Sequence, residues 1–154
     1  MVGFEHERAT FADLYRADFA HMVRIAWLIV GSAAVAEDVV QDAFLRVGRR
    51  LDRVDSPVAY LRAAVVNGCR NELRRTKRFV AGNVPELVSN DSVMVELLDA
   101  LATLDARQRT AIVLRYVADT ADHEIAKILG VRQTTVRSLI FRGLKELRRE
   151  IADG

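Results

Sequence analysis

The sequence contains little of what stabilises covalently linked or turn-rich folds. Cys69 is the only cysteine among 154 residues, so the chain can form no intrachain disulfide and no cysteine cluster for a metal. Two prolines and 8 glycines are too few for a fold built from many turns, whereas 51% of the residues are apolar. We therefore predict long helices around a hydrophobic core.

The sequence also lacks the patterns of a membrane protein or an enzyme. The apolar run from Ile25 to Val30 is too short to span a bilayer, and no signal peptide precedes it. Lys127 stands where a zinc-protease motif beginning at His123 would need its second histidine. From the lack of a signal peptide and a membrane span we predict a cytoplasmic protein. Because the sequence has no paired acid and base and no phosphate-binding loop, we predict that it is not an enzyme and needs no cofactor or metal.

Charge is distributed unevenly along the chain, although the net charge is only +2. Acidic residues outnumber basic ones up to Phe44, and basic residues outnumber acidic ones between Arg62 and Arg78. The C-terminal segment is basic again. Two separate basic stretches indicate two contacts with a polyanion.

Apolar residues recur at helical spacing through most of the sequence. We predict helices over residues 8–30, 33–51 and 57–78, two short helices between 92 and about 117, and a final helix that ends near 152. Ser32, Ser56 and Asp105 are expected N-caps, the last of them with Gln108 three residues on. Trp27 is an expected core residue of the first helix and Tyr116 of the fifth.

Residues 79–91 lose this periodicity and contain several helix breakers, with either Asp91 or Ser92 expected to cap the next helix. We therefore predict an all-α protein of two small helical domains, residues 8–78 and 92–152, joined by a flexible linker. A fully extended linker of this length would span roughly 40 Å.

Residues 122–142 have the pattern of a helix-turn-helix. Ala126 is small enough for a second helix to approach, and Gly130 permits the positive φ of a sharp turn. The apolar contacts between the two helices are expected from Ile125, Leu129, Val131, Val136 and either Leu139 or Ile140. The outer face of the second helix would present Arg137, Ser138, Phe141, Arg142 and Lys145. Such side chains suit phosphates and base edges, whereas an ordinary hairpin with a solvated basic face is the alternative.

The helix predicted at 57–78 carries a second basic stripe. It comprises Tyr60, Asn67, Asn71, Arg74 and Arg78, flanked by Arg62, Arg70 and Arg75. Arginines can hold phosphates, amides can contact base edges, and an aromatic ring can stack on an unpaired base. A solvated cationic helix is the alternative, but the second basic element favours nucleic acid.

One face of the helix predicted at 33–51 is of mixed character. It presents Asp38, Gln41, Asp42, Leu45 and Arg49. An exposed leucine among acids fits a protein partner with basic edges, and spacing alone leaves a merely solvated face equally open.

Together these segments resemble a bacterial RNA polymerase sigma factor of the extracytoplasmic-function (ECF) type. The resemblance runs from about Phe11 to Ile151 and rests on AEDVVQDAF at 36–44, PVAYLRAAVVNGCRNELRR at 57–75, LDARQR at 104–109, and the helix-turn-helix. The first motif resembles the family's polymerase-docking helix, the second its −10-reading segment, and the last its −35-reading unit. Asn71 stands where aspartate is usual, and Ala121 replaces the usual serine cap, leaving Thr120 or Asp122 to serve.

The resemblance implies a function and a set of sites. The chain would bind core RNA polymerase, recognise promoter DNA and direct initiation, in the family often for a stress or envelope regulon and under an inhibitory anti-sigma protein that can hold it at the membrane. Implied polymerase contacts are Asp38, Gln41, Asp42 and Leu45. Implied −10 contacts are Tyr60, Arg62, Asn67, Arg70, Asn71, Arg74 and Arg75. Implied −35 contacts are Arg132, Thr134, Thr135, Arg137, Ser138, Phe141 and Arg142.

Two alternatives remain open from the sequence. A DNA-binding regulator that acts as a dimer without polymerase would leave the acidic face near Asp38 and the second basic stripe unexplained. A protein-interaction adaptor that mimics the fold would have no need of the basic faces.

Overall fold

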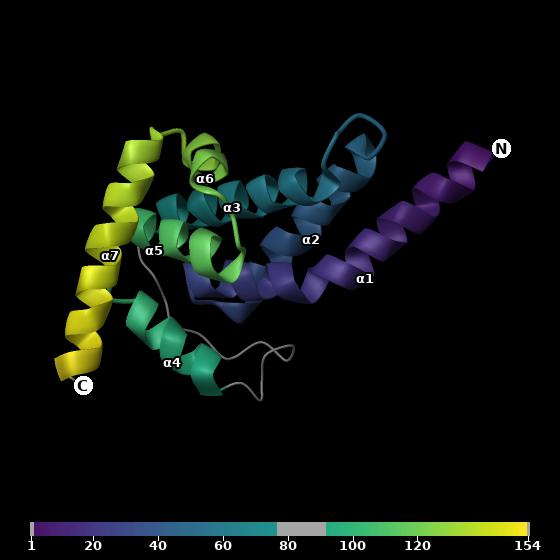
Figure 1. The fold of residues 1–154 in the computed structure, drawn as a ribbon. Coiled ribbons are helices and arrows are strands. Elements are labelled where there is room, and N and C mark those ends of the chain that lie inside the picture. The colour runs from purple at the N-terminus through teal and green to yellow at the C-terminus, as the bar shows by residue number, and fades with distance from the viewer. Residues whose placement is uncertain (1, 77–91, 154) are drawn as a thin grey trace.

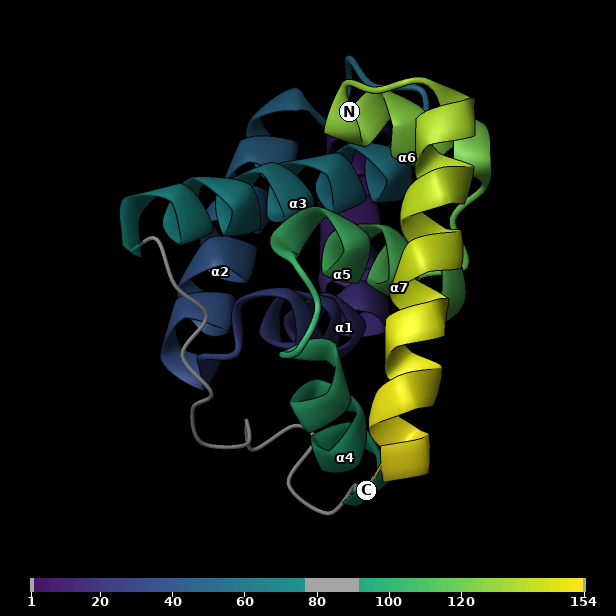
Figure 2. The ribbon, with the colours of Figure 1, turned by 90° about the vertical axis from the view of Figure 1, so that its left-hand side faces the viewer.

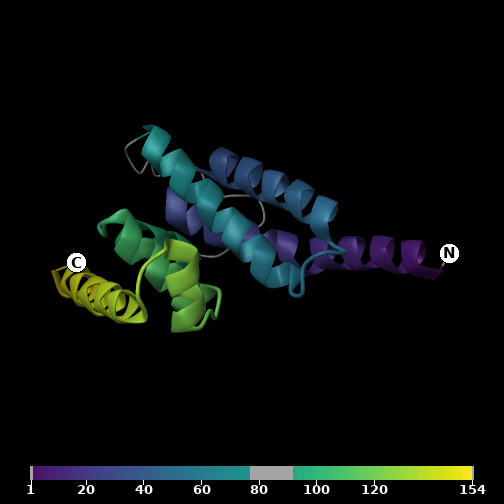
Figure 3. The same ribbon diagram turned by 90° about the horizontal axis from the view of Figure 1, so that it is seen from above.

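The computed structural model describes residues 2–76 and 92–153, which form helices joined by short loops, with no strand among them. In chain order the elements are α1 (Val2–Val30), α2 (Ala33–Arg50), α3 (Pro57–Thr76), α4 (Ser92–Leu101), α5 (Ala106–Ile112), the π-helical turn η2 (Val113–Val117), α6 (Asp122–Leu129) and α7 (Gln133–Asp153) (Figure 1). The predicted all-α class is confirmed. The N-terminal end of α1 projects beyond the other helices (Figures 1 and 3).

The predicted helix caps are present where α2, α3 and α5 begin. The Ser32 hydroxyl accepts from the Val35 amide at 3.3 Å, and the Ser56 hydroxyl accepts from the Ala59 amide at the same distance. The Asp105 carboxylate accepts from the Gln108 amide at 2.9 Å. Each bond satisfies one of the amides that a helix start leaves without an intrahelical partner.

Helices α1, α2 and α3 pack on one another around large side chains that are completely buried, including Trp27, Phe44 and Leu61. Helix α3 approaches α2 closely at Gly68, where a Cβ would lie only 2.7 Å from Cγ1 of Val39. This crossing therefore depends on the absence of a side chain at Gly68.

Several predicted boundaries differ from the structure. Helix α1 begins at Val2 rather than at residue 8, and Leu51 lies just beyond α2. Helix α3 ends at Thr76, so the prediction that it continues to Arg78 falls outside the described residues, as do the predicted linker and the possible cap at Asp91.

The prediction that Tyr116 belongs to the core is wrong, because its side chain is 59% exposed. The reason is η2, in which the Ala118 amide donates to the Val113 carbonyl five residues back at 3.0 Å. A π-helical turn contains more residues than an α-helical turn, so the side chains in it and after it point in other directions than α-helical spacing predicts. Tyr116 therefore does not lie on the buried face, which other side chains occupy. Thr120, just beyond the turn, is buried instead.

The helices before and after residues 77–91 pack against each other. Helix α1 contacts α4, α5 and η2, and α3 contacts α6 (Figure 2). Arg109 of α5 is central to this contact, because its Nε donates to the Ile29 carbonyl at 2.9 Å and its Nη1 donates to the Leu104 carbonyl at 3.0 Å. Only 3% of Arg109 is exposed, and burial lowers its pKa to about 10. A cation here also suits the C-terminal end of α1, where carbonyls lack intrahelical partners.

Candidate nucleic-acid interface

Helices α6 and α7 form the predicted helix-turn-helix. Helix α6 ends at Gly130, whose φ of +68° is the left-handed conformation expected for this turn. The Val131 amide donates to the Ala126 carbonyl at 3.0 Å and closes the turn. Leu139 and Ile140, one of which was expected to face α6, are both buried. The predicted geometry of this segment is confirmed.

The outer face of α7 is open to solvent. Arg137, Ser138, Phe141 and Arg142 together line a hollow of about 410 Å³, and 70% of Phe141 is exposed. Arg132 and Thr134 are exposed beside them, and Thr135 is half-buried. An exposed aromatic ring between two guanidinium groups is uncommon on a face that serves only solubility, and it suits a groove of DNA. That each of these residues contacts DNA remains a prediction.

The start of α6 differs from the prediction. Ala121 is the N-cap residue and supplies no side-chain bond, so the prediction that Thr120 or Asp122 serves as the cap is wrong. The Thr120 hydroxyl donates to the Ala118 carbonyl at 3.3 Å. Asp122 is the first residue of α6, and its carboxylate pairs with Arg115 and with Arg137. The residue expected to cap the helix is thus part of an ion-pair cluster.

The residues predicted to contact the −10 element separate into two groups on α3. Asn67, Asn71, Arg74 and Arg75 are exposed, whereas Tyr60, Arg62 and Arg70 are half-buried. The first group is partly engaged within α3 itself, because Arg74 donates to the Asn71 side-chain oxygen at 3.1 Å and Arg75 pairs with Glu72 at 3.7 Å.

Two of the half-buried residues, Arg62 and Arg70, contact α6 of the helix-turn-helix. Arg62 Nη1 lies 3.0 Å from the Glu124 carboxylate of α6, and Arg70 Nη1 donates to the Ile128 carbonyl at 3.4 Å. Two of the arginines predicted to touch the −10 element are therefore occupied by α6 in this arrangement. Unpaired DNA could reach them only after α6 moved away from α3.

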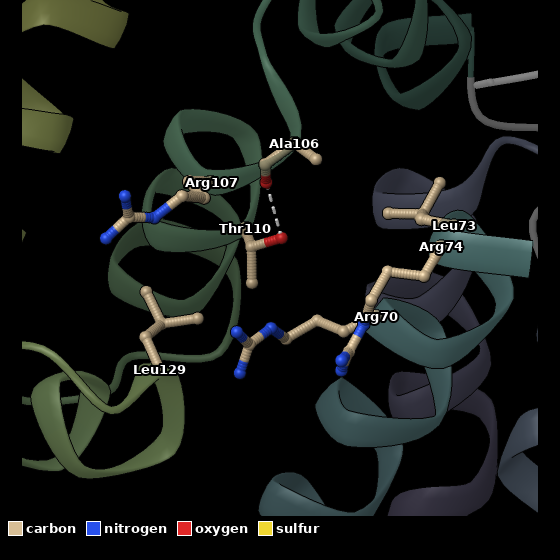
Figure 4. Close-up of a pocket in the computed structure, with 7 residues that line it drawn as sticks. All are labelled: Arg70, Leu73, Arg74, Ala106, Arg107, Thr110 and Leu129. Atoms are coloured by element: carbon tan, nitrogen blue, oxygen red, sulfur yellow. Dashed lines mark hydrogen bonds between the residues drawn. The ribbon is translucent and has the colours of Figure 1, made fainter. Parts of the chain in front are cut away.

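A cavity of about 320 Å³ lies at this junction of α3, α5 and α6. Figure 4 shows Arg70 extending from α3 towards α5 and α6, while Arg107 points away from α3. Leu73 and Leu129 form apolar parts of the lining, and the Thr110 hydroxyl donates to the Ala106 carbonyl at 2.7 Å. The cavity lies between the two halves beside the long bond from Arg70 to Ile128, so it marks a less tightly packed part of their interface.

Helix α2, which carries the mixed face, lies on the side of the molecule opposite α7 (Figure 2). Asp38, Gln41, Asp42 and Leu45 are all exposed, with Leu45 61% exposed. Asp42 pairs with Arg46 at 3.1 Å, a solvent-exposed pair that a basic partner could replace. The polymerase-docking and −35 surfaces predicted for this chain are therefore simultaneously accessible on opposite sides.

Sequence reasoning missed three residues of this interface. Arg115 and Tyr116 project from η2 beside α6, with the Arg115 guanidinium 5.9 Å from the centre of the Tyr116 ring. A π-turn has no reliable sequence pattern, so their exposure could not be foreseen. Glu124 lies within the predicted helix-turn-helix segment, but its pairing with Arg62 depends on the packing of α6 against α3, which the sequence pattern does not predict.

Burial also shifts the pKa values of two groups near α3, the His21 imidazole and the Cys69 thiol. The pKa of His21 lies below 6.5 because of burial, with the guanidinium groups of Arg24 and Arg62 acting in the same direction and Asp18 opposing them. Burial raises the pKa of the Cys69 thiol, so this thiol stays protonated at neutral pH. Among the residues described, no group of three or more His, Cys, Asp or Glu side chains is placed to hold a metal ion.

Family models match both halves of the chain. The model for Sigma-70 region 2 matches residues 14–79, and that for Sigma-70, region 4 matches residues 94–147. Among curated proteins, the ECF RNA polymerase sigma factor SigL of Mycobacterium tuberculosis is 32% identical over 157 residues, which cover 92% of this chain and 89% of SigL. The chain belongs to the ECF RNA polymerase sigma factors.

Two further likenesses agree with this membership. SigM of the same organism, also an ECF RNA polymerase sigma factor, is 30% identical over 152 residues, covering 93% of this chain and 78% of SigM. In fold, the chain resembles the Bartonella quintana sigma factor RpoE in its complex with the anti-sigma factor NepR, with a TM-score of 0.76 and 21% identity over 93% of this chain and 97% of that one. None of the helices described has the length and apolar character required to cross a membrane.

Proposed function

We propose that this ECF sigma factor binds core RNA polymerase through the exposed face of α2 and positions it on promoter DNA through α3 and α7. In this proposal residues 8–78 bind polymerase and the −10 strand, residues 92–152 bind the −35 duplex, and residues 79–91 link them. The protein catalyses no reaction, since polymerase supplies the chemistry. It acts in the cytoplasm, on promoters of a stress or envelope regulon.

The observation that carries the proposal is the outer face of α7. Arg137 and Arg142 flank Phe141 over an open hollow on the second helix of a helix-turn-helix, where side chains can enter a major groove. The exposed α2 face on the opposite side of the molecule leaves room for polymerase while α7 holds DNA. A DNA-binding regulator that worked alone would have no use for that second surface.

An anti-sigma protein is a further partner in this proposal. The similar RpoE structure is a complex of a sigma factor with its anti-sigma factor. A partner of that kind would act on this chain by covering α2 or by holding α6 against α3, since both surfaces must be free in an open promoter complex.

The test is reconstitution with purified core RNA polymerase. We expect the chain to bind core in a pull-down and to produce discrete new transcript starts on genomic fragments, whereas core alone produces none. DNA binding without core, and unchanged transcript starts, would instead indicate a regulator that acts without polymerase.

A pair of variants on α7 makes this test specific. Arg137→Ala should weaken binding at the −35 element by about 1–3 kcal/mol, because Arg137 lies on the open face of the helix. Arg149→Ala, farther along α7 and paired with Glu146, should leave promoter binding unchanged. Equal promoter affinity for the wild-type chain and Arg137→Ala would refute the −35 assignment.

A further inference from the structure

Asp122 places a carboxylate behind two arginines at the edge of the helix-turn-helix. Arg115 reaches it from η2 and Arg137 from the start of α7, the Arg137 Nε lying 3.5 Å from Asp122 Oδ2. The Asp122 side chain is only 20% exposed, whereas those of Arg115 and Arg137 are 42% and 65% exposed. The two guanidinium groups thus face solvent, whereas the Asp122 carboxylate that pairs with them is mostly shielded from it.

The local backbone makes this cluster possible. The π-turn η2 brings Arg115 alongside the first residue of α6, and Ala121 caps α6 without any side-chain bond. Because the Asp122 carboxylate accepts no capping bond from α6 in this arrangement, it is available to both guanidinium groups. Two arginines share one carboxylate, so the cluster keeps a net positive charge towards solvent.

DNA phosphates would compete with Asp122 for the same two arginines. Contacts with phosphates carry no sequence information, whereas an arginine on a base edge distinguishes base pairs. Phosphate contacts made by Arg115 or Arg137 compete with the ion pairs of these arginines with Asp122. This competition weakens the phosphate contacts on every DNA sequence, whereas a bidentate contact from Arg137 to a guanine edge forms only where the sequence supplies a guanine.

We propose that Asp122 determines specificity at the −35 element by restraining Arg115 and Arg137 from unselective contacts with phosphates. The inference rests on the proposed function. It adds that the Asp122 carboxylate weakens binding to DNA of any sequence and thereby increases the preference for the correct −35 sequence. It also assigns Arg115, outside the helix-turn-helix itself, to the same surface.

A purely structural role for Asp122 would give a different result. A carboxylate in the first turn of a helix interacts favourably with the helix dipole, so its loss would lower stability. Such a loss would leave the preference among −35 sequences unchanged. Sequence preference is therefore the deciding readout, and thermal stability is measured beside it.

The experiment uses holoenzyme reconstituted from core polymerase and the full chain, on a promoter library with a randomised −35 element. For Asp122→Asn we expect transcripts from a wider range of −35 sequences, with the preference for the best over the average sequence reduced roughly twofold to fivefold. Binding to a duplex of random sequence should become tighter and should depend more steeply on salt. The matched control is Glu146→Gln, which removes an exposed carboxylate paired with Arg149 elsewhere on α7.

The outcomes separate this inference from the proposed function. Wild-type holoenzyme without discrete starts would overturn the proposed function. Selective transcription by wild type together with an unchanged −35 preference in Asp122→Asn would overturn the inference alone, whatever happens to stability. Adding Arg115→Gln to Asp122→Asn should restore part of the selectivity, and a complete lack of restoration would refute the role of Arg115.

Discussion

Arg109 joins the two halves of the molecule, and replacing it tests how strongly they are held together. Its guanidinium group donates to the Ile29 carbonyl at the end of α1 and to the Leu104 carbonyl before α5. Arg109→Met would keep most of the buried side-chain volume but remove both donors. The two carbonyls would then be left without these partners in a region that is almost closed to water.

The magnitude follows from those two bonds. A buried polar group left without a partner costs about 1–3 kcal/mol. Part of this loss is offset because a buried guanidinium group, whose pKa is lowered to about 10, no longer has to be desolvated. We therefore expect Arg109→Met to lower the free energy of unfolding by about 2–4 kcal/mol, and Tm by roughly 5–15 °C.

Urea unfolding followed by two signals is the assay. Trp27 is the only tryptophan and lies two residues before Ile29, so its fluorescence reports on the end of α1, while far-UV circular dichroism reports on all helices. Both midpoints should fall in Arg109→Met. The matched control is Arg107→Met, since Arg107 lies on the same helix but is exposed and points away from α3. A free energy of unfolding within about 0.5 kcal/mol of wild type would refute the reasoning.

Two further predictions concern Glu124, which pairs with Arg62 of α3, and His21 of α1. Glu124→Gln should free Arg62 from its ion pair and tighten binding of a labelled single-stranded −10 oligonucleotide to the free chain by roughly twofold to fivefold, measured by fluorescence anisotropy; equal affinity would mean that α6 does not restrict α3. His21 has a pKa below 6.5, so below that pH the unfolded chain binds a proton that the folded chain resists, and stability should fall as pH decreases. His21→Gln should flatten this slope between about pH 7.5 and about pH 5.5 in urea unfolding, and an unchanged slope would assign it to other groups.

The sequence predicted what depends on local pattern. Helix positions follow from apolar spacing, and the caps at Ser32, Ser56 and Asp105 follow from side chains that accept amide bonds in the first turn. The turn at Gly130 was equally foreseeable, because its position between two apolar stripes requires a residue that tolerates positive φ. These features involve residues within a few positions of one another.

The sequence did not predict what depends on contacts between distant segments. The close crossing at Gly68 and the buried position of Arg109 are set by the path of α2 and α1, which no local spacing encodes. Tyr116 was misplaced because one π-turn changes the register without a sequence signal. For the candidate site, the exposure of Arg137, Ser138, Phe141 and Arg142 on α7 could be predicted, but the ion pairs of Asp122 and Glu124 could not.

These distant contacts also indicate how the molecule opens. The α1 side of the interface combines buried apolar residues, among them Leu28 and Leu114, with the two bonds of Arg109. The α3 side has the Arg62–Glu124 pair, the long bond from Arg70 and the adjoining cavity. A part-exposed ion pair contributes little once solvent or DNA phosphates can replace it, whereas buried apolar surface has no such substitute. Helix α6 should therefore leave α3 before α4 and α5 leave α1, and Arg62 and Arg70 would be the first side chains released.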